Sequence, residues 1–326
     1  MLHVFVGEGG ALRWDKGAET GTGPLPAGTV WLDLLNPTPE ELARAEAMMG
    51  TPLPTREQMV EIEESSRLRL VGAAAHLTVM ALVWADTDQP RITPVSFVLA
   101  GGRLATVHHV DPQAFLAFRR RASRGGFAGT TGEAVLAALV EGMVERTAVV
   151  LRRIGIELDA MGGRALRGRL PVRGESSDDA RTLRRIGQTG QLIGKAHVSL
   201  SSVGRMLAFL SRGEGWTCSK PTRRWVRTTQ RDITGLDEYA LFLSGKVNLL
   251  LDTALGQITI EQNEIVKIVS ILTMVLLPPT LVATVFGMNF EWMPETGQVW
   301  GYPLALLLML ASAVVPLLHV LRRRWL

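Results

Sequence analysis

The sequence predicts an α+β membrane protein. An N-terminal cytoplasmic α/β domain and a long helical hairpin precede a long stalk helix, which continues into the first of two membrane spans. Three observations predict this fold class. Residues 1–125 mix strand and helix patterns, residues 131–210 have helical periodicity, and residues 268–321 hold two long apolar runs. The chain is therefore expected to divide into a soluble part and a membrane part.

Four apolar segments in the first part are rich in β-branched residues and are bounded by Gly, Pro or Asp, as strands are. They are VWLDLL (Val30–Leu35), AHLTVMALVWA (Ala75–Ala85), ITPVSFVLA (Ile92–Ala100) and RLATVHHV (Arg103–Val110). Thr38-Pro39-Glu40-Glu41 predicts a helix start, with Thr38 as N-cap and proline in the first turn. His108 and His109 are expected at the surface of a strand end rather than as metal ligands.

The middle of the chain predicts two long helices. From Thr131 onward, EAVLAALVEGMVERTAVVLRRIGIELDAMGG repeats apolar residues at three- and four-residue spacing. A polar break (Arg167–Asp179) separates it from a second helix near Ala180–Leu210. Together they predict a helical hairpin whose arginines form a solvated face, with acidic lipid or a neighbouring subunit as the alternative partner.

Two segments near the C-terminus are long enough to cross a membrane. Ile268–Phe290 contains no charged residue, and Thr296–Leu321 contains none if His319 is neutral. A helix needs about 20 residues to cross roughly 30 Å of hydrocarbon. The alternative is a buried hairpin in a soluble core, whose helices rarely stay free of charge for this length. Two membrane spans are therefore expected.

The charges around these spans predict their orientation. Lys267 opens the first span and Arg322–Arg324 follow the second, whereas the connecting loop holds Glu291 and Glu295 and no Lys or Arg. The N-terminus also lacks the pattern of a signal peptide. Both ends of the chain are therefore expected in the cytoplasm, and only the loop lies on the far side.

The first span belongs to a longer helix that carries a polar stripe. From about Gly235 the chain reaches Pro278 without a proline, which predicts one continuous helix. Positions at alternating steps of three and four form a seam that faces a common axis. They are Asn263, Val266, Ser270, Thr273, Leu277, Thr280 and Thr284, and the stripe extends downward through Thr259, Gly256 and Asp252.

The stripe has two interpretations. Each Ser or Thr alone can bond to the preceding turn and assist helix packing. A whole polar stripe inside a span favours a water-filled path instead, to which carbonyls freed by Pro278 and Pro279 would add oxygen atoms. One stripe per chain cannot enclose a pore, so symmetric copies are expected around it.

Composition argues against several classes of function. Lys and Arg number 35 and Asp and Glu number 31, a near balance that argues against nucleic-acid binding. The single cysteine, Cys218, is expected to be an ordinary free thiol, because one cysteine allows no intramolecular disulfide and no cysteine zinc cage. We find no phosphate-binding loop and no catalytic constellation. No enzymatic activity and no organic cofactor are therefore expected.

The loop between the spans carries the most specific motif. Gly287-Met288-Asn289, followed by Phe290, Met293-Pro294-Glu295 and a second span that ends in basic residues and Trp-Leu, resembles the CorA family of magnesium transport channels. The resemblance extends upstream through KVNLLLD (Lys246–Asp252), IEQNEIVKI (Ile260–Ile268) and LPPTLVATVFGMN (Leu277–Asn289), and more faintly to VEIEESSR (Val60–Arg67). In this position and with these flanks, Gly-Met-Asn is highly specific.

The resemblance implies a homopentamer in the cell (inner) membrane, with Mg²⁺ as the transported and regulatory ion. Asn289 would ring the outer mouth and select the ion, Gly287 and Met288 would shape its turn, and Glu291 and Glu295 would concentrate cations there. The implied segments are a cytoplasmic α/β domain (1–130), a helical hairpin (131–234), the stalk and first span (235–286), the extracytoplasmic loop (287–298), the second span (299–321) and a basic cytoplasmic tail (322–326).

The resemblance also implies roles further down the pore. The polar stations would be Thr284, Thr280 and Asn263, within the stripe that includes Thr273, and the hydrophobic gate would be Leu277 with Val269 or Val266. Asp252 would form a carboxylate ring at the cytoplasmic end of the pore. The basic belt would be formed by Arg322, Arg323 and Arg324. Glu61 and Asp232 match the positions of a regulatory Mg²⁺ site between neighbouring protomers. Mg²⁺ bound there would offset carboxylate repulsion and hold the ring closed.

Two alternatives stay open. A zinc-exporting branch of the same family shares the architecture, and Co²⁺ or Ni²⁺ can pass a site that contacts a hydrated ion. A membrane-tethered sensor or enzyme, with the hairpin as a plain anchor, would tolerate Ala or Leu at Thr280, Thr284 and Asn289. The MNFEWMPE segment and the LPPTLVA run favour the magnesium branch.

Overall fold

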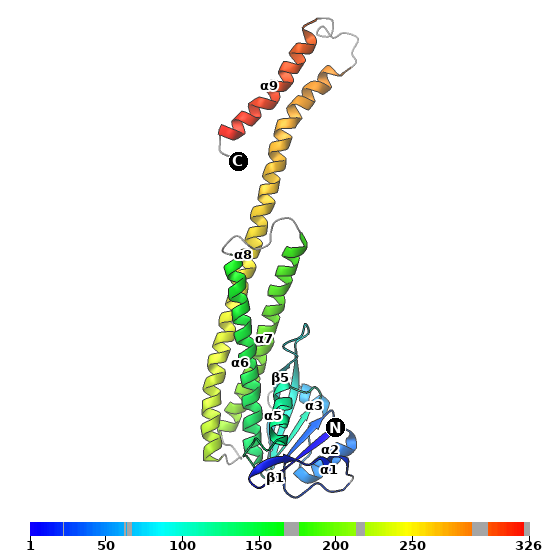
Figure 1. Ribbon diagram of the computed structural model, residues 1–326, viewed down its shortest axis with the longest axis vertical. Coiled ribbons are helices and arrows are strands. Elements are labelled where there is room, and N and C mark those ends of the chain that lie inside the picture. Colours follow the sequence, from blue (N-terminus) through cyan, green and yellow to red (C-terminus); the bar gives the residue numbers. More distant parts are fainter. Residues whose placement is uncertain are drawn as a thin grey trace. The chain divides into compact units, whose positions relative to one another are not determined.

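The chain folds into two compact units, Met1–Leu251 and Asp252–Leu326, in a computed structural model (Figure 1). The structure describes all residues except 22, 62, 64–66, 166–175, 213–218, 289–298 and 323–326. The predicted free thiol, Cys218, lies outside the described residues.

The described residues of the first unit form a seven-stranded sheet of order β2-β1-β3-β7-β6-β5-β4. Neighbouring strands are antiparallel except for β3 and β7, which are parallel. The strands are β1 (Leu2–Glu8), β2 (Ala11–Trp14), β3 (Thr29–Leu35), β4 (Leu68–Val71), β5 (Ala74–Val83), β6 (Arg91–Ala100) and β7 (Arg103–His108). The four predicted strands are confirmed as β3, β5, β6 and β7. The other three escaped prediction because β2 and β4 span four residues each, and β1 is buried on both faces and shows no alternation.

Helices cover both faces of this sheet. The shorter ones are α1 (Lys16–Thr20), α2 (Pro39–Met49), α3 (Arg56–Val60) and α5 (Gln113–Ser123). The longer ones are α6 (Gly132–Ala165), α7 (Ser176–Arg212) and α8 (Lys220–Phe286), and α9 (Gly301–Arg322) belongs to the second unit.

α2 begins as the sequence predicts. The Thr38 hydroxyl oxygen accepts from the Glu41 backbone N–H at 3.2 Å, and the Glu41 carboxylate accepts from the Thr38 N–H at 2.9 Å. Pro39 occupies the first turn, where its missing N–H costs nothing. Gly50 ends the helix in the left-handed conformation at φ 66°, which glycine adopts without strain.

The sheet separates two hydrophobic cores, because successive residues of a strand face opposite sides. On one side, α5, α6, α7 and the first-unit part of α8 pack around residues such as Trp31 and Phe97, both fully buried. On the other side, α1, α2 and α3 pack against residues such as Leu32 and Val98. Consequently α3 and α8 lie on opposite faces of the sheet.

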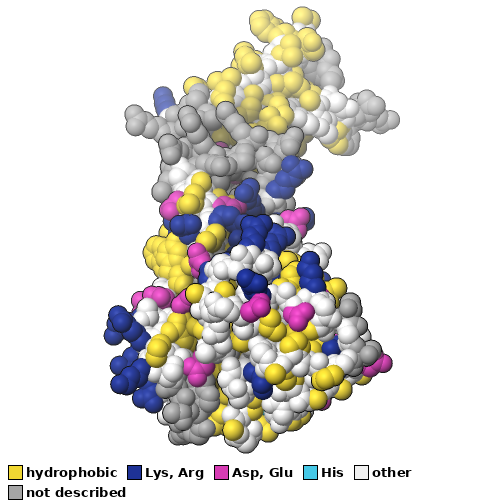
Figure 2. Space-filling view, turned by 60° about the horizontal axis from the view of Figure 1, so that its bottom comes forward, with side chains coloured by type: hydrophobic (Ala, Val, Ile, Leu, Met, Phe, Trp, Pro, Cys, Tyr) yellow, Lys and Arg dark blue, Asp and Glu magenta, His cyan; other side chains and the backbone are white. Residues whose placement is uncertain are grey.

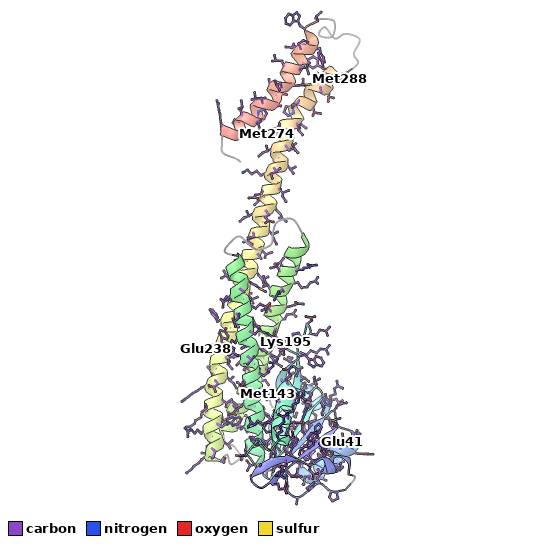
Figure 3. The ribbon with its side chains drawn as sticks, viewed as in Figure 1. Glu41, Met143, Lys195, Glu238, Met274 and Met288 are labelled. Carbon is purple, nitrogen blue, oxygen red and sulfur yellow. The ribbon has the colours of Figure 1, made fainter. Side chains whose placement is uncertain are left out.

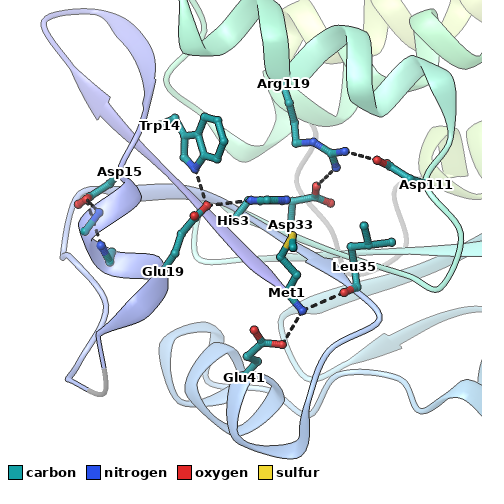
Figure 4. A network of polar contacts seen from close by, with 12 residues as sticks. Met1, His3, Trp14, Asp15, Glu19, Asp33, Leu35, Glu41, Asp111 and Arg119 are labelled. Atoms are coloured by element: carbon teal, nitrogen blue, oxygen red, sulfur yellow. Dashed lines mark hydrogen bonds and ion pairs between the residues drawn. The ribbon is translucent and has the colours of Figure 1, made fainter.

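A charged network is buried beside the parallel pair β3 and β7 (Figure 4). The Asp33 carboxylate accepts from the Thr106 hydroxyl at 2.6 Å, lies 2.8 Å from His108 Nε2 and pairs with Arg119, which also pairs with Asp111. Burial alone would raise the pKa of Asp33. The charge and hydrogen bond of His108, together with Arg119 and Thr106, outweigh it and lower that pKa from 3.8 to about 2.

The expectation that His108 lies at the surface is wrong, because its side chain is fully buried. Its second ring nitrogen, Nδ1, lies 3.1 Å from the Val110 carbonyl oxygen. Both nitrogens therefore lie within hydrogen-bond distance of oxygen atoms. The partner Asp33 is 75 positions away in the sequence, so no local pattern at the strand end indicated the pairing.

The predicted helical hairpin is confirmed as α6 and α7, and polar contacts tie it to α8. Lys246 of α8 pairs with Asp159 of α6, and His197 Nδ1 of α7 lies 2.6 Å from an Asp237 oxygen of α8. α8 begins at Lys220 rather than near Gly235. Pro221 lies in the first turn, where proline does not oppose a helix, and a glycine such as Gly235 is tolerated inside a long helix. Neither residue therefore marks the start of α8.

Candidate functional site

The helices of the second unit are the distal part of α8 and α9. Each helix holds an 18-residue apolar window, of which 0% is buried in α8 and 6% in α9. Figure 2 shows hydrophobic side chains gathered on this unit, and mixed charged and hydrophobic side chains on the first. Apolar helices exposed to this extent require lipid or other chains around them. The two predicted spans are confirmed as helices long and apolar enough to cross a membrane.

Each of these helices has one half-buried face. In α8 the positions are Ile271, Val275, Pro278, Pro279, Val282 and Phe286. In α9 they are Gly301, Met309, Ser312, Ala313 and Pro316, together with the buried Ala305. Because no other described element belongs to this unit, each of these faces is covered by the other helix.

The predicted polar stripe lies on a different face of α8. All seven positions, Asn263, Val266, Ser270, Thr273, Leu277, Thr280 and Thr284, are exposed, as are Asp252 and Val269. Residues that are two positions apart in a helix point about 200° away from each other around its axis. Thr273, Thr280 and Thr284 therefore point away from Val275, Val282 and Phe286. The stripe is therefore uncovered within the described chain.

The stripe threonines donate their hydroxyl hydrogens to the helix itself. The Thr273 hydroxyl donates to the Val269 carbonyl at 2.8 Å, and the Thr280 hydroxyl to the Leu276 carbonyl at 2.7 Å. Thr284 does the same to the Thr280 carbonyl at 2.7 Å. Each hydroxyl oxygen keeps lone pairs that point outward. These three threonines therefore present hydrogen-bond acceptors, because their hydroxyl hydrogens are used inside the helix.

Two adjacent prolines alter the backbone at the same level. Pro278 and Pro279 have no N–H, so the carbonyls of Met274 and Val275 lack their usual donors four residues on. Unpaired carbonyls inside hydrocarbon are costly unless they reach water or a polar partner. Their position in the span is consistent with a hydrated path beside this helix.

The outer end of α8 leads into the Gly-Met-Asn motif. After Phe286, the Gly287 N–H donates to the Ala283 carbonyl at 2.9 Å and the Met288 N–H to the Val285 carbonyl at 3.3 Å. Met288, labelled in Figure 3, is exposed at the end of the helix. The predicted selectivity residue Asn289 and the outer-mouth acids Glu291 and Glu295 lie outside the described residues.

The basic belt is described only in part. Arg322 is exposed at the end of α9, and Arg323 and Arg324 lie outside the described residues.

The two candidate residues for the regulatory Mg²⁺ site are not brought together within one chain. Glu61 follows α3, where its carbonyl accepts from Arg67 Nε at 2.5 Å. Asp232 lies on α8. α3 and α8 belong to the cores on opposite faces of the sheet, which separates the two residues within one chain. The described residues contain no group of three or more His, Cys, Asp or Glu side chains placed to hold a metal.

Sequence reasoning missed two acids beside Asp232. Glu141 and Glu145 of α6 line the same hollow of about 610 Å³ as Asp232, and all three are exposed. Their spacing of four on a helix places them on one face, which was the available signal. Their proximity to α8 depends on the packing of α6 and could not be deduced from spacing alone.

The comparisons with known proteins agree with the family resemblance. Residues 26–323 match the family described as CorA-like Mg²⁺ transporter protein. The chain is 32% identical over 297 residues to proteins named magnesium transport protein CorA from Mannheimia succiniciproducens and from Escherichia coli (strain K12). Each match covers 91% of this chain and 92% of the relative.

Solved structures share the fold. The complete structure of the CorA magnesium transporter from Methanocaldococcus jannaschii matches with a TM-score of 0.76 at 16% identity, covering 100% of this chain and 99% of that one. The full-length CmaX protein matches with a TM-score of 0.71 at 16% identity, covering 99% and 97%. The family match over residues 26–323 and the 32% identity to relatives of similar length show family membership and not only a shared fold. The protein belongs to the CorA family.

Proposed function

We propose that this chain assembles as a homopentamer in the cell (inner) membrane and conducts Mg²⁺ into the cytoplasm down its electrochemical gradient. The observation that carries the proposal is the polar stripe of α8, which stays exposed in a helix otherwise built for hydrocarbon. The relatives named magnesium transport proteins support Mg²⁺ as the cargo. The proposed orientation places both termini in the cytoplasm.

The geometry of one chain supports the proposed assembly. α9 covers one face of α8, so the stripe on another face can be enclosed only by further copies of α8. Closed cyclic symmetry is the default for identical chains, and it places the same stripe residue of every copy at one level around the axis. Five copies are proposed because the family resemblance implies a pentamer.

The threonine geometry suits a hydrated cation. Mg²⁺ releases its waters reluctantly, and those waters present O–H groups outward. Thr273, Thr280 and Thr284 have already donated their hydrogens to the helix, so their outward lone pairs accept from such waters. The rings are neutral and therefore guide the ion without holding it tightly.

Selection is assigned to Asn289 at the outer mouth. A ring of Asn side-chain oxygens can hold the hydrated ion through its waters, whereas carboxylates there would retain it more strongly. Glu291 and Glu295 would raise the local concentration of cations beside that ring. Asp252 would form the carboxylate ring at the cytoplasmic end of the stripe.

Gating is assigned to the apolar positions of the stripe and to cytoplasmic Mg²⁺. Leu277 with Val269 or Val266 would form a ring that dewets when narrow. Glu61 of one protomer and Asp232 of the next would bind the regulatory ion, and Glu141 and Glu145 add negative charge beside Asp232. Loss of that ion would leave the carboxylates to repel each other and let the stalks spread.

The test is divalent-cation uptake into liposomes that contain the purified chain and an Mg²⁺-sensitive dye. Wild type is compared with Asn289→Ala, and Asn248→Ala serves as the matched control because Asn248 is exposed on α8 outside the stripe. Mg²⁺ entry that Asn289→Ala abolishes and Asn248→Ala preserves is the expected result, with the oligomer intact in both variants.

The same assay separates the alternatives. Parallel measurements with Co²⁺ and Ni²⁺ define which other ions pass. Entry of Zn²⁺ without Mg²⁺ would move the protein to the zinc branch. Absence of flux for every ion, from correctly oriented oligomers at low internal Mg²⁺, would contradict the channel and leave the tethered sensor.

A further inference from the structure

The first unit contains a hollow of about 1090 Å³, a volume typical of a large small-molecule site. Small side chains such as Ala137 and Gly142 of α6 make room for it. This α5–α6 hollow is lined by residues from 113–121 on α5, 127–131 in the connection that follows, 133–149 on α6 and 219–225 at the start of α8. The groups that line it determine which ligand it can hold.

One end of the α5–α6 hollow is positively charged. The Arg121 guanidinium lies over the rings of Phe118 and Phe127, 5.9 Å and 5.4 Å from their centroids. Both rings also line the hollow, and no described carboxylate pairs with this arginine. Contact with two rings holds the cation in place and leaves its N–H groups available to an anion.

The other end is negatively charged. Glu141 and Glu145 line it, are exposed and lie four residues apart on one face of α6. Arg146 lines this end too, but it pairs with Asp86 in the connection after β5. The two glutamates therefore keep acceptor oxygens for a donor group on a ligand.

The two charged ends are separated along α6. Ala134 lies at the positive end, because a Cβ at Gly129 would meet both Ala134 and the Phe127 ring. Gly142 lies at the negative end, between the two exposed glutamates, and is eight residues further along the helix. Eight residues correspond to about 12 Å of helix, which is comparable to the length of a nucleoside monophosphate.

An aromatic ring lies between the ends. Trp225 is half-buried, lines the hollow and follows Thr222 by one turn of α8. The hydroxyls of Thr222 and Ser219 donate to the Glu133 carboxylate at 2.5 Å and 3.0 Å, which ties the start of α8 to the start of α6 and occupies this third glutamate. The Trp225 indole N–H is buried and has no acceptor among the described residues. An unpaired buried N–H is costly, so an acceptor on a ligand would offset that cost.

We propose that the α5–α6 hollow binds a nucleotide whose base carries an amino group. The phosphate pairs with Arg121, because a guanidinium fork matches phosphate oxygens. The base lies against Trp225, and its amino group donates to Glu141 or Glu145. Anion, flat ring and amine follow one another in the ligand in the order in which their partners follow one another along the hollow.

Simpler ligands match this lining less well. An inorganic anion would leave the aromatic ring and the glutamate end without a partner, and a simple cation would leave the arginine end without one. The absence of a phosphate-binding loop from the sequence does not oppose the proposal, because an arginine side chain can hold a single phosphate. The site lies within the first unit and does not depend on the proposed pore.

Equilibrium binding of radiolabelled adenosine monophosphate (AMP) to the full chain in detergent tests the site. We expect saturable AMP binding, and about tenfold weaker binding of adenosine, which lacks the phosphate. Inosine monophosphate presents a carbonyl oxygen to the carboxylates in place of the amino group, so it should also bind about tenfold more weakly than AMP. Absence of saturable binding up to about 1 mM AMP, or equal affinity for the three compounds, would overturn the inference.

A substitution at the positive end tests the phosphate contact. Arg121→Gln removes the cation and should weaken AMP binding about tenfold while leaving adenosine binding unchanged. Arg223→Gln is the matched control, because Arg223 is exposed on the first turn of α8 and does not line the hollow. Equal weakening of AMP and adenosine in Arg121→Gln, or an equal loss in the control, would contradict a phosphate bound at Arg121.

A second pair of variants tests whether AMP occupies the hollow itself. Ala137→Leu fills the hollow from its α6 wall and should abolish AMP binding. Ala160→Leu adds the same volume at an exposed position of α6 outside the hollow and should leave binding at the wild-type level. Thermal unfolding checks that both variants fold. A folded Ala137→Leu variant that binds AMP as wild type does would overturn the site. Because the measurement is binding and not ion uptake, its outcome is separate from that of the channel assay.

Discussion

The two units of this chain bury their apolar residues by different means. In the first unit, Leu77 and Leu104 are fully buried between sheet and helices. In the second, Leu277 and Leu281 are 66% and 65% exposed on α8. The first unit therefore completes its own core, whereas the apolar helices of the second require lipid or other chains around them. Substitutions in the first unit should change stability, and substitutions on the uncovered stripe should change transport.

The largest effect is expected from the buried charge network. Arg119→Met leaves Asp33 fully buried without its arginine, and removing one partner of a buried ion pair costs about 3 to 5 kcal/mol. The measurement is the free energy of unfolding of the full chain in detergent, followed by near-ultraviolet circular dichroism. Arg120→Met changes an exposed neighbour on the same helix and should stay near wild type. Equal losses in both variants would contradict the role of the pair.

This network marks the limit of what the sequence could reveal. The strands at Val30–Leu35 and Arg103–Val110 follow from local composition, and so does the helix after Thr38. The pairing of Asp33 with His108 does not, because it depends on two strands becoming parallel neighbours after a long connection. The register of a sheet is a tertiary property that local periodicity does not contain.

In the second unit, more of the structure could be predicted from the sequence. Its spans and the spacing of Thr273, Thr280 and Thr284 could be predicted, because a helix fixes which residues share a face. What spacing could not show is which face of α8 is half-buried, and therefore that the stripe lies outside that face. Contacts made only between copies are likewise absent from one chain, so the roles of Asn289 and Asp232 stay predictions.

The lowered pKa of Asp33 gives a second test of how the first unit is stabilised. Its folded-state value of about 2 lies below the ordinary 3.8, so the group stabilises the fold above pH 3.8 and loses that contribution as the pH falls toward 2. The full shift from 3.8 to about 2 corresponds to roughly 2.4 kcal/mol, of which about 2 kcal/mol is lost between pH 5 and pH 2. Unfolding free energies measured between pH 5 and pH 2 should fall by about that amount more in wild type than in Asp33→Asn. Parallel curves for the two proteins would contradict the assignment.

A substitution at an exposed position of the stripe should change transport rather than stability. Leu277→Asn puts a polar group into the proposed apolar ring, so water should remain there and Mg²⁺ uptake at high internal Mg²⁺ should rise roughly tenfold. Leu277→Met keeps the position apolar and should preserve the closed state. The liposome assay measures both, and thermal unfolding checks that neither variant loses stability. A stable Leu277→Asn variant with unchanged uptake would place the gate elsewhere.

The smallest expected effect tests a contact that belongs to the first unit alone. Thr38→Ala removes the acceptor for the Glu41 N–H at the start of α2, and loss of such a cap costs about 1 kcal/mol. Thr38→Ser keeps an oxygen in the same place and should restore most of the stability. Because α2 covers the sheet face opposite α8, Mg²⁺ uptake should be unchanged in both variants. A transport defect in Thr38→Ala at full stability would show that the two units are coupled through this face of the sheet.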